Sequence, residues 1–420
     1  MKRPSPAAVG LLALVAMVGT LYAIAVLNAA PPHPDLDVYL RGARDLAEGR
    51  PLYDAFVNAS GDPALRDAFI YPPLFALLML PFLVVPAAIV PIVWLIATHA
   101  ALSMTFVIVL RRFGASRLVM LVSLLITLAF YPLWAEASQA QANLPILLLV
   151  TLGILGVSDG KPKGGIWIGL AAALKLTPGL LLVWLLVERR FRAAAWVMAG
   201  FAAATALAAL LRPADSLIYA RSVVPQLASG TAYWSNQSLD GVVARLFTVN
   251  PYTTPLVGMP WAHLLVVALM VAALAFWVWT RRGEPEPLAR GFVFLPLLPL
   301  VSTVSWEHHL VILLPLVWLI VAVLAERGWP LRETALAGLA IVTLLAIPHL
   351  PFGPPYATDF ARAAHTHNPL LIAGANRLFV GSVLLLIVSP WLFSRAGLAG
   401  RHWRSLKPIA DRATPPAAAA

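Results

Sequence analysis

The stretch AVGLLALVAMVGTLYAIAVLNAAPPHPDLDVYLRGARDLAEGRPLYD, residues 8–54, decides the fold class. Its first part, 8–29, is an apolar run long enough to cross a bilayer, which needs about 20 residues. Lys2 and Arg3 precede the run, which exceeds the roughly 7–15 residues of a signal-peptide core. Because further apolar runs follow, we interpret it as an uncleaved membrane anchor, ended by a proline cluster.

The composition of the whole chain also indicates a membrane protein. Of its 420 residues, 60% are hydrophobic and 12% are charged, and the mean hydropathy is +0.82. Soluble domains are about half apolar and about a quarter charged, so an ordinary globular enzyme, a disordered chain and a fibrous repeat are excluded. The absence of Cys excludes disulfides, thiolate metal sites and cysteine nucleophiles. Nine further long apolar runs, together with 8–29, make ten predicted spans. The nine are 87–110, 117–134, 143–158, 193–211, 258–280, 291–305, 308–325, 333–350 and 375–394.

Two apolar segments are interrupted. Residues 71–85 are short and rich in proline, which predicts a partial helix on the outer side. Residues 164–187 contain Lys175 and Pro178, which predict two half-helices that enter and leave the membrane on the same side. We therefore expect an all-α, polytopic bundle of about 10–12 membrane helices, forming one domain over 1–412 with a disordered tail at 413–420.

The net charge of +11 is explained by membrane topology. With the N-terminus inside, most of the 30 basic residues lie in inner segments, as the positive-inside rule requires. This favours contact with anionic lipid and not with nucleic acid. Three outer loops are predicted, at 30–70, 212–257 and 351–374. An alternative topology, in which 71–85 and 164–187 each cross once, places Arg111, Arg112 and Arg117 outside and is ranked lower.

The first outer loop carries two carboxylates. From Asp35 onward, apolar residues recur at helical spacing and predict an amphipathic helix on the outer surface: Leu36, Tyr39, Leu40, Ala43, Leu46 and Ala47. Asp35 and Asp37 stand at its start, where Asp is a preferred helix cap. The same carboxylates could act as a general base or bind a cation.

Three more polar stretches face the same outer side: EASQAQANLP at 136–145, YWSNQSLDG at 233–241 and SWEHHL at 305–310. Their amides and aromatic rings suit sugar hydroxyls and sugar faces, although capping, helix–helix hydrogen bonds and an interfacial aromatic belt are alternatives. His308 and His309 diverge by about 100° on a helix, so a shared metal ion is not expected. Lys175 within an apolar segment calls for an anionic partner such as a lipid phosphate; Arg41 and Arg377 are other candidates.

Taken in order, six blocks of the chain resemble GT-C-type integral membrane glycosyltransferases, and more narrowly the actinobacterial polyprenol-phosphate-mannose-dependent α-(1→2)-mannosyltransferases that act on phosphatidylinositol mannosides. The blocks are DLDVYLRGARDLAEGRPLYD at 35–54, FIYPPLFALLMLP at 69–81, QANLPILLL at 141–149, LKLTPGLLLVWLLVERRFRAA at 174–194, NQSLDGVVARLF at 236–247 and SWEHHLVILLP at 305–315. One departure is QAQAN at 139–143, where a Gly-Gln-x-Asn pattern is commoner in the family.

The resemblance implies transfer of mannose from a polyprenyl-phosphate donor to a glycolipid or lipoglycan acceptor, with inversion to an α-mannoside. It maps the catalytic base to Asp35, with Asp37 at a variable position, and the motif histidine to His308 and His309. We expect the other site residues to bind phosphate or sugar: Lys175, Arg41, Tyr39, Gln141, Asn143, Asn236, Gln237, Trp306 and Glu307. No metal or cofactor is expected, because side-chain cations can neutralise a monophosphate. We expect a monomer in the plasma membrane, with its site on the extracytoplasmic side.

Three other functions stay open at this point. A sister enzyme that uses polyprenyl-phosphate arabinofuranose would carry similar blocks. A transporter or flippase for an envelope lipid would explain Lys175 and a broken helix, but no inverted repeat is visible and the polar groups gather at one face. A non-catalytic assembly subunit is the third alternative.

Overall fold

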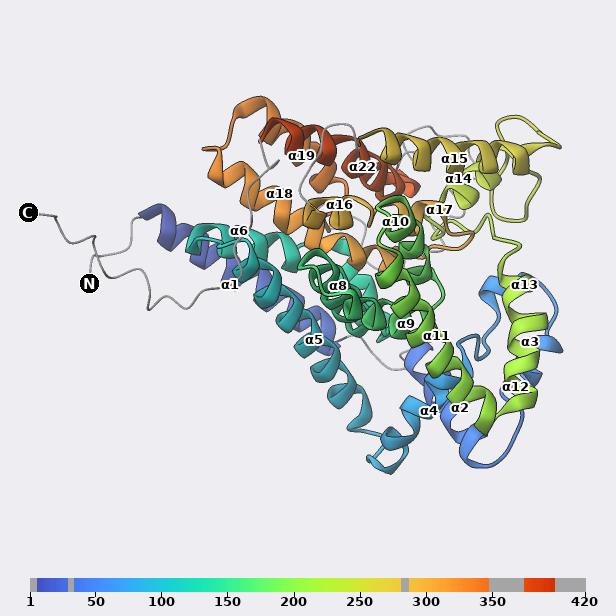
Figure 1. Ribbon diagram of the computed structural model, residues 1–420. Helices are drawn as coiled ribbons and strands as arrows, with labels where there is room; N and C mark the ends of the chain where they lie inside the picture. Colours follow the sequence, from blue (N-terminus) through green and yellow to red (C-terminus); the bar gives the residue numbers. More distant parts are fainter. Residues whose placement is uncertain (1–5, 29–33, 281–286, 347–373, 397–420) are drawn as a thin grey trace, which may run out of the picture.

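The computed structural model describes residues 6–28, 34–280, 287–346 and 374–396. Within these ranges every regular element is a helix, and an isolated β-bridge joins Phe130 to Leu345. Figure 1 shows the helices packed into one bundle with short helical segments gathered at one end. The predicted all-α class is confirmed.

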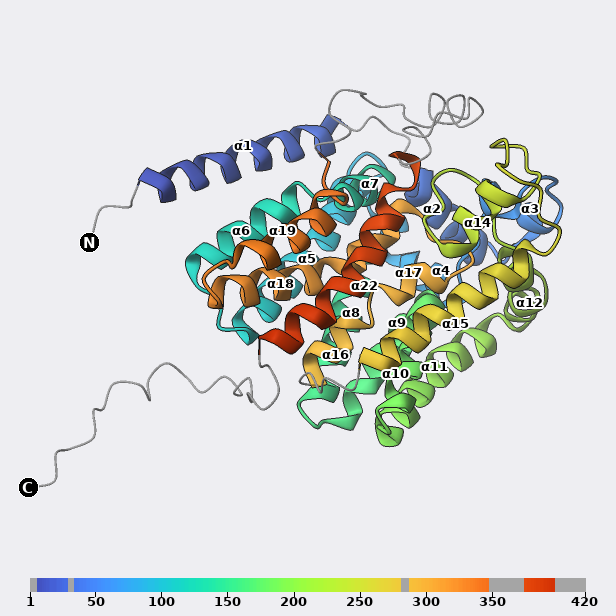
Figure 2. The same ribbon diagram turned by 90° about the horizontal axis from the view of Figure 1, so that it is seen from above.

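Six stretches of the described chain are long and apolar enough to cross a membrane. They are α1 (Pro6–Asn28), α5 (Val90–Arg112), α11 (Phe191–Leu211), α15 (Ala262–Thr280), α22 (Arg377–Arg395) and the continuous pair η7 (Glu307–Leu313) and α18 (Leu314–Glu326). The last stretch is the most buried of the six: 89% of its 18-residue apolar window is buried, whereas 6% of the window in α1 is buried. Figure 2 shows α1 along the outside. The chain is therefore a multi-pass membrane protein.

Six of the ten predicted spans coincide with these stretches. The predicted spans 117–134, 143–158, 291–305 and 333–350, and the predicted partial helix 71–85, form shorter helices. They are α4 (Pro73–Met79) with η2 (Leu80–Val84), α6 (Arg117–Leu128), α8 (Asn143–Ser158), α16 (Pro287–Val293), α17 (Leu297–Val301) and α19 (Leu331–Val342). Proline explains two of the interruptions, because it lacks a backbone N–H and fits best in a first turn. Pro296 separates α16 from α17, and Pro132 lies in the first turn of α7 (Tyr131–Gln139).

The segment 164–187 is broken at Lys175, as the sequence predicted. Helix α9 (Gly165–Leu174) ends there, Lys175 is extended, and η4 (Thr177–Leu180) and α10 (Leu181–Val187) follow. Both ends of the segment return to the same end of α8. There Arg190 donates a hydrogen bond to Val157 O (2.7 Å), and a Cβ on Gly164, in η3 (Pro162–Gly164), would come within 2.8 Å of Val157 N. The two half-helices therefore form the predicted hairpin, whose two ends lie at the same end of α8.

Short helices form the first two of the three loops that the sequence predicted to lie outside. They are α2 (Pro34–Ala47), α3 (Asp54–Val57), η1 (Pro63–Leu65), α12 (Pro213–Ile218), the π-helical η5 (Tyr219–Val223), α13 (Val224–Leu227) and α14 (Leu239–Phe247). The predicted amphipathic helix is α2, which buries Leu36, Tyr39, Leu40 and Ala43.

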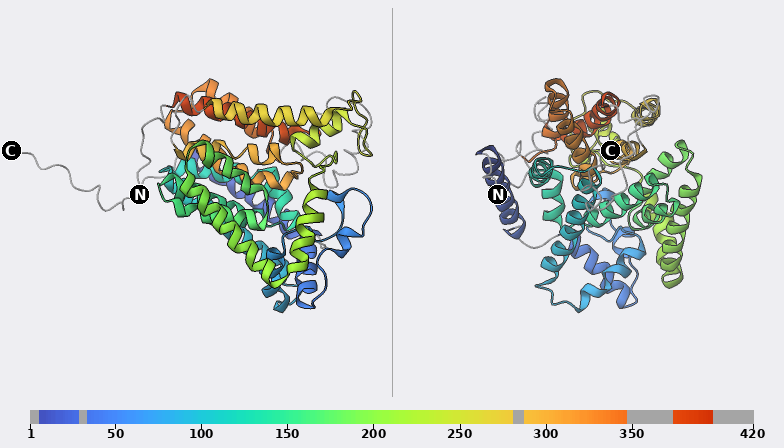
Figure 3. Two further views of the ribbon diagram at one scale, coloured as in Figure 1. Left: turned by 45° about the vertical axis from the view of Figure 1, so that its right-hand side comes forward. Right: turned by 60° about the vertical axis from the view of Figure 1, so that its left-hand side comes forward.

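The two loops bind each other. Leu52 N donates to Asp215 Oδ1 (3.0 Å), and the Tyr252 hydroxyl donates to Asp62 Oδ2 (2.8 Å). The left view of Figure 3 shows the blue first loop against the light-green second loop at one end of the bundle. The third predicted loop, except for residue 374, and the tail at 413–420 lie outside the described residues.

Candidate active site

Asp35 begins the site in the first turn of α2. Its half-buried carboxyl hydrogen-bonds with the side chain of Gln141. One turn later, the fully buried Tyr39 donates its hydroxyl hydrogen to Gln141 Oε1 (2.8 Å), and the Tyr71 hydroxyl lies 3.2 Å from that of Tyr39. Because Gln141 Oε1 accepts from Tyr39, its amide N–H groups are left to donate to the Asp35 carboxylate.

The environment of Asp35 changes its acidity. Burial raises the pKa of the Asp35 carboxyl above its ordinary value, and the nearby charge of Asp67 acts in the same direction. The hydrogen bond from Gln141 and the positive charge of Lys175 oppose this rise. Asp35 is thus a partly desolvated carboxyl held next to a cation, which suits a base that must accept a proton from a substrate.

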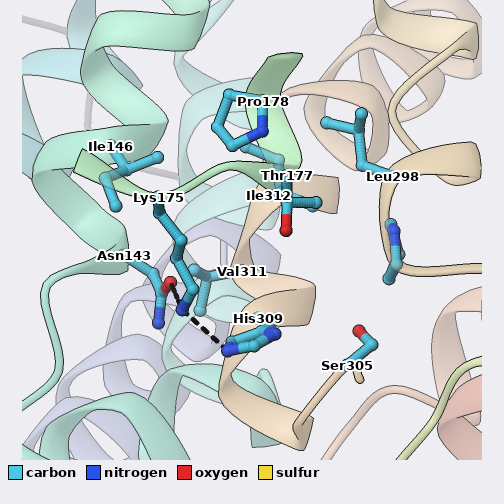
Figure 4. Close-up of a pocket in the computed structure, with 11 residues that line it drawn as sticks. Asn143, Ile146, Lys175, Thr177, Pro178, Leu298, Ser305, His309, Val311 and Ile312 are labelled. Atoms are coloured by element: carbon cyan, nitrogen blue, oxygen red, sulfur yellow. Dashed lines mark hydrogen bonds between the residues drawn. The ribbon is translucent and has the colours of Figure 1, made fainter. Parts of the chain in front are cut away.

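Lys175 stands at the break between α9 and η4, where its backbone is extended. Its ammonium group donates to Asn143 Oδ1 (2.8 Å) and lies 2.7 Å from His309 Nε2. The interruption of the helix has a clear consequence, because it turns a long side chain toward residues at the starts of α8 and η7. Figure 4 shows Lys175 between Asn143 and His309.

The two histidines have different surroundings. His309 faces Lys175 with Nε2, and its Nδ1 lies 3.3 Å from Trp306 N. The His308 ring stands edge-on to the His309 ring, at 4.7 Å between centroids, and its Nε2 is buried with no partner among the described residues. The chain therefore brings His309 into the cluster around Lys175.

A cavity opens beside this cluster. Polar residues form one part of its lining: Asn143, Lys175, Thr177, Ser305 and His309. Apolar residues form the rest: Ile146, Pro178, Leu298, Pro299, Val311 and Ile312. Its free space of about 30 Å³ holds one or two water molecules, so a larger ligand enters only if the walls move apart. The hydroxyl of the fully buried Ser305 has no hydrogen-bond partner within the described structure. Such a lining suits a molecule with an anionic head and an apolar chain.

Asn236 and Gln237 occupy a different position from the one predicted. Both are fully buried. Asn236 Nδ2 donates to Thr231 O and Thr303 O (2.9 Å each), and its Oδ1 accepts from Ser305 N (2.8 Å). Gln237 bonds in the same way to backbone groups at Trp234, Ala375 and Phe379. The Asn236 amide fixes the second loop to the stretch before His309, and the Gln237 amide fixes it to the start of α22. The structure does not present either amide to a ligand.

Other predicted residues lie away from Lys175. Asp37 is exposed on α2, and Arg41 is exposed and paired with Asp67. Glu307 accepts a hydrogen bond from the Tyr131 hydroxyl (3.1 Å). The half-buried Trp306 packs edge-on against Tyr233, and the guanidinium of Arg377 lies over the Tyr131 ring at 4.9 Å.

The structure adds residues to which the sequence gave no role in the site. Tyr71 joins Tyr39 beside Gln141, while Thr177 and Ser305 line the cavity. Glu136 is buried directly behind Asn143. The signal for Glu136 in the sequence was an acidic residue within an Asn- and Gln-rich stretch. Its contact with Asn143 depends on a turn between the two residues, in which Ala140 adopts a left-handed conformation (φ 48°).

Comparison with known proteins identifies the class. The family model for glycosyltransferase family 87 matches residues 69–303. A polyprenol-phosphate-mannose-dependent alpha-(1-2)-phosphatidylinositol mannoside mannosyltransferase of Mycobacterium tuberculosis is 32% identical over 76% of this chain and 77% of its own length. The corresponding pentamannoside mannosyltransferase of Mycolicibacterium smegmatis is 29% identical over 86% of each chain. No solved structure matches significantly.

The fold and these matches define a multi-pass membrane glycosyltransferase. The chain belongs to glycosyltransferase family 87.

Proposed function

We propose that this enzyme transfers mannose from a polyprenyl-phosphate-mannose donor to a hydroxyl of a phosphatidylinositol mannoside or a related envelope glycolipid, forming an α-(1→2) linkage. The names of the two mycobacterial relatives support both the polyprenyl-phosphate-mannose donor and the phosphatidylinositol mannoside acceptor. The observation that carries the proposal is the contact of Lys175 with His309 at an apolar-walled cavity, with Asp35 near enough to affect the lysine electrostatically.

The donor fits the cavity by its chemistry. A polyprenyl phosphate combines an apolar chain with an anionic head, and it reaches the site from within the bilayer. Leu298, Val311 and the other apolar residues of the lining would contact the isoprenoid chain, and Lys175 and His309 the phosphate. Charge-assisted hydrogen bonds from these two side chains stabilise the negative charge that grows on the phosphate as it leaves.

The acceptor reacts at the opposite face of the sugar. Its hydroxyl oxygen forms a bond to the anomeric carbon while the bond from that carbon to the phosphate oxygen breaks and its electron pair stays on the phosphate. Asp35 takes the hydroxyl proton, with Gln141 holding the carboxylate in position. Attack from the opposite face converts a β-linked donor into an α-linked product, by the logic of inverting sugar chemistry.

The location of the site follows from charge. Basic residues and their acidic partners, such as Arg112 with Asp159 and Arg290 with Glu188, occupy the far ends of α5, α8, α10 and α16. We assign those ends to the cytoplasm by the positive-inside rule, and the site to the extracytoplasmic face of the plasma membrane. The enzyme acts there as a monomer without a metal ion, because the Lys175 ammonium group supplies positive charge.

The test uses the purified full-length chain in lipid nanodiscs with radiolabelled polyprenyl-phosphate mannose and extracted phosphatidylinositol mannosides. We expect a labelled product whose linkage analysis gives α-(1→2)-mannose. A parallel reaction contains polyprenyl-phosphate arabinofuranose. Transfer from that donor alone would replace mannose by arabinofuranose in the proposal, and transfer from neither donor, with folded protein, would contradict it.

A further inference from the structure

Glu136 is a buried acid behind the site. It lies on α7, is 1% exposed and does not line the cavity. Its Oε1 accepts hydrogen bonds from the backbone N–H groups of Asn143 (2.8 Å) and Leu144 (3.3 Å). Its Oε2 accepts from the side-chain amide of Asn143, Nδ2, at 2.7 Å. The two carboxylate oxygens of Glu136 thus accept hydrogen bonds from three N–H groups at the start of α8.

The two oxygens do different work. Oε1 accepts hydrogen bonds from backbone N–H groups at the N-terminus of α8. This is an ordinary helix cap, and it gives Glu136 a structural role. Oε2 contributes nothing to that cap, because its partner is a side chain. A carboxylate accepts hydrogen bonds and cannot donate them, so it fixes which end of the Asn143 amide faces it: the NH₂ group turns toward Glu136.

The orientation of Asn143 decides what Lys175 meets. With Nδ2 directed at Glu136, the amide oxygen Oδ1 must point the other way, and there it accepts the hydrogen bond of Lys175 (2.8 Å). An amide turned round would present its NH₂ group to an ammonium group, and two donors repel. The negative charge of Glu136 is also near enough to attract the Lys175 ammonium group.

We propose that Glu136 is a positioning residue for glycosyl transfer: by fixing the Asn143 amide, it holds the Lys175 ammonium group beside His309 at the phosphate end of the cavity. The inference rests on the proposed function, because it assigns a donor phosphate to Lys175. Glu136 acts through Asn143 and touches no substrate.

Glu136→Gln is the first test. Gln has one acceptor oxygen where three N–H groups converge, so it can continue to cap α8 only by directing its own NH₂ group at Asn143. The Asn143 amide then turns round and the hydrogen bond to Lys175 is lost. We expect kcat/KM for the donor to fall about 100-fold, as for other small misplacements of catalytic groups. Part of the fall should be a rise in donor KM, which a smaller fraction of folded enzyme cannot produce.

The matched control is Glu333→Gln. Glu333 is also buried, but it lies on α19 near Arg327 (3.5 Å) and Arg395 (3.7 Å), outside the site. Its loss should lower thermal stability and leave the donor KM unchanged. An unchanged donor KM and kcat in Glu136→Gln would overturn the proposal.

The double variant Glu136→Gln with Asn143→Asp reverses the polarity of the pair. The introduced glutamine can cap α8 with its oxygen and donate its NH₂ group to one oxygen of the introduced aspartate, whose other oxygen accepts from Lys175. We expect kcat/KM to recover to within about tenfold of the wild-type enzyme, whereas independent defects would add. A folded double variant as inactive as Glu136→Gln would overturn the proposal.

Two further measurements test the proposal if Glu136→Gln does not fold or if the transferred sugar is not mannose. Asn143→Ala leaves Glu136 and its cap on α8 in place, so it tests the connection even if Glu136→Gln does not fold, and full activity would contradict the proposal. Binding of a short-chain polyprenyl phosphate, without sugar, is measured on the wild type and Glu136→Gln. Weaker binding in the variant supports the inference even if the transferred sugar is not mannose. Equal binding together with equal turnover contradicts it.

Discussion

Lys175 Nζ lies 2.7 Å from His309 Nε2, although 134 residues separate them in the chain. Only one proton can lie between these two nitrogens, so the pair shares a single hydrogen bond and directs its other N–H groups elsewhere. For Lys175 these are Asn143 and the adjoining cavity. A broken helix and a short 3₁₀ segment thus bring together a lysine and a histidine that lie far apart in the chain.

We expect Asp35→Asn to lower the transfer rate by about 10³-fold or more, because general base catalysis contributes roughly 10²–10⁴. Asparagine retains the size of the side chain and a hydrogen bond with Gln141, so folding and donor binding should persist. Asp37→Asn is the matched control on the same turn, and its exposed side chain predicts near wild-type turnover. If Asp37→Asn alone is inactive, the assignment of the base passes to Asp37.

Lys175→Met should lower kcat by about 10²–10³, as does the loss of other groups that stabilise developing negative charge. His309→Gln should also impair turnover, because it removes the ring that contacts Lys175. His308→Gln should cost less activity, since His308 makes no contact with Lys175 in the described structure. Steady-state kinetics with a labelled donor compares the three, and greater damage from His308→Gln would contradict the assignment.

The pH profile should carry the signature of Asp35. Burial raises the pKa of Asp35 above its ordinary value, and the base must be ionised to accept a proton. The acidic limb of kcat/KM should therefore lie above about 3.9, the ordinary pKa of Asp, with activity lost as the pH falls through the raised pKa. A limb at or below the ordinary value would contradict the prediction.

Stability should follow the opposite trend at this group. Between the ordinary and the raised pKa, the folded chain binds more protons than the unfolded chain. The contribution of Asp35 to stability is therefore largest below its ordinary pKa and is lost as the pH rises through the raised value. Thermal unfolding of Asp35→Asn should lose this pH dependence.

Asn236→Ala should destabilise the enzyme without direct damage to substrate contacts. It leaves the buried Thr231 O and Ser305 N without their amide partner, and each unsatisfied buried group costs about 1–3 kcal/mol. The melting temperature should fall, while the donor KM of the remaining folded enzyme changes little. Asn58→Ala, at an exposed position, is the control. A large rise in donor KM with unchanged stability would show that Asn236 contacts substrate.

Transfer should persist after dialysis against EDTA, because the Lys175 ammonium group supplies positive charge at the phosphate end of the cavity. Activity that is lost in EDTA and restored by Mg²⁺ or Mn²⁺ would show that a metal cation also neutralises the phosphate.

The sequence by itself determined the membrane class, the amphipathic helix after the first span and the break at Lys175. These features are local: apolar run length sets the membrane segments, helical spacing sets the buried face of α2, and a lysine followed by Leu-Thr-Pro-Gly interrupts a short helix. The sequence also singled out Lys175, because an ionisable group at membrane depth is costly and needs a function. The family motifs singled out Asp35 and the histidine pair.

Only the tertiary structure decided which of these groups meet. Asp35 and Asp37 stand on one helical turn, and His308 and His309 are neighbours, so no local pattern separates them; packing against Gln141 and Lys175 does. Asn236 and Gln237 suit sugar by composition, yet burial commits their amides to backbone groups. Glu136 acquired its partner only when the turn at Ala140 brought α7 back onto α8. Hydrogen bonds between distant segments depend on a few tenths of an ångström and on direction, and neither is encoded in spacing along the chain.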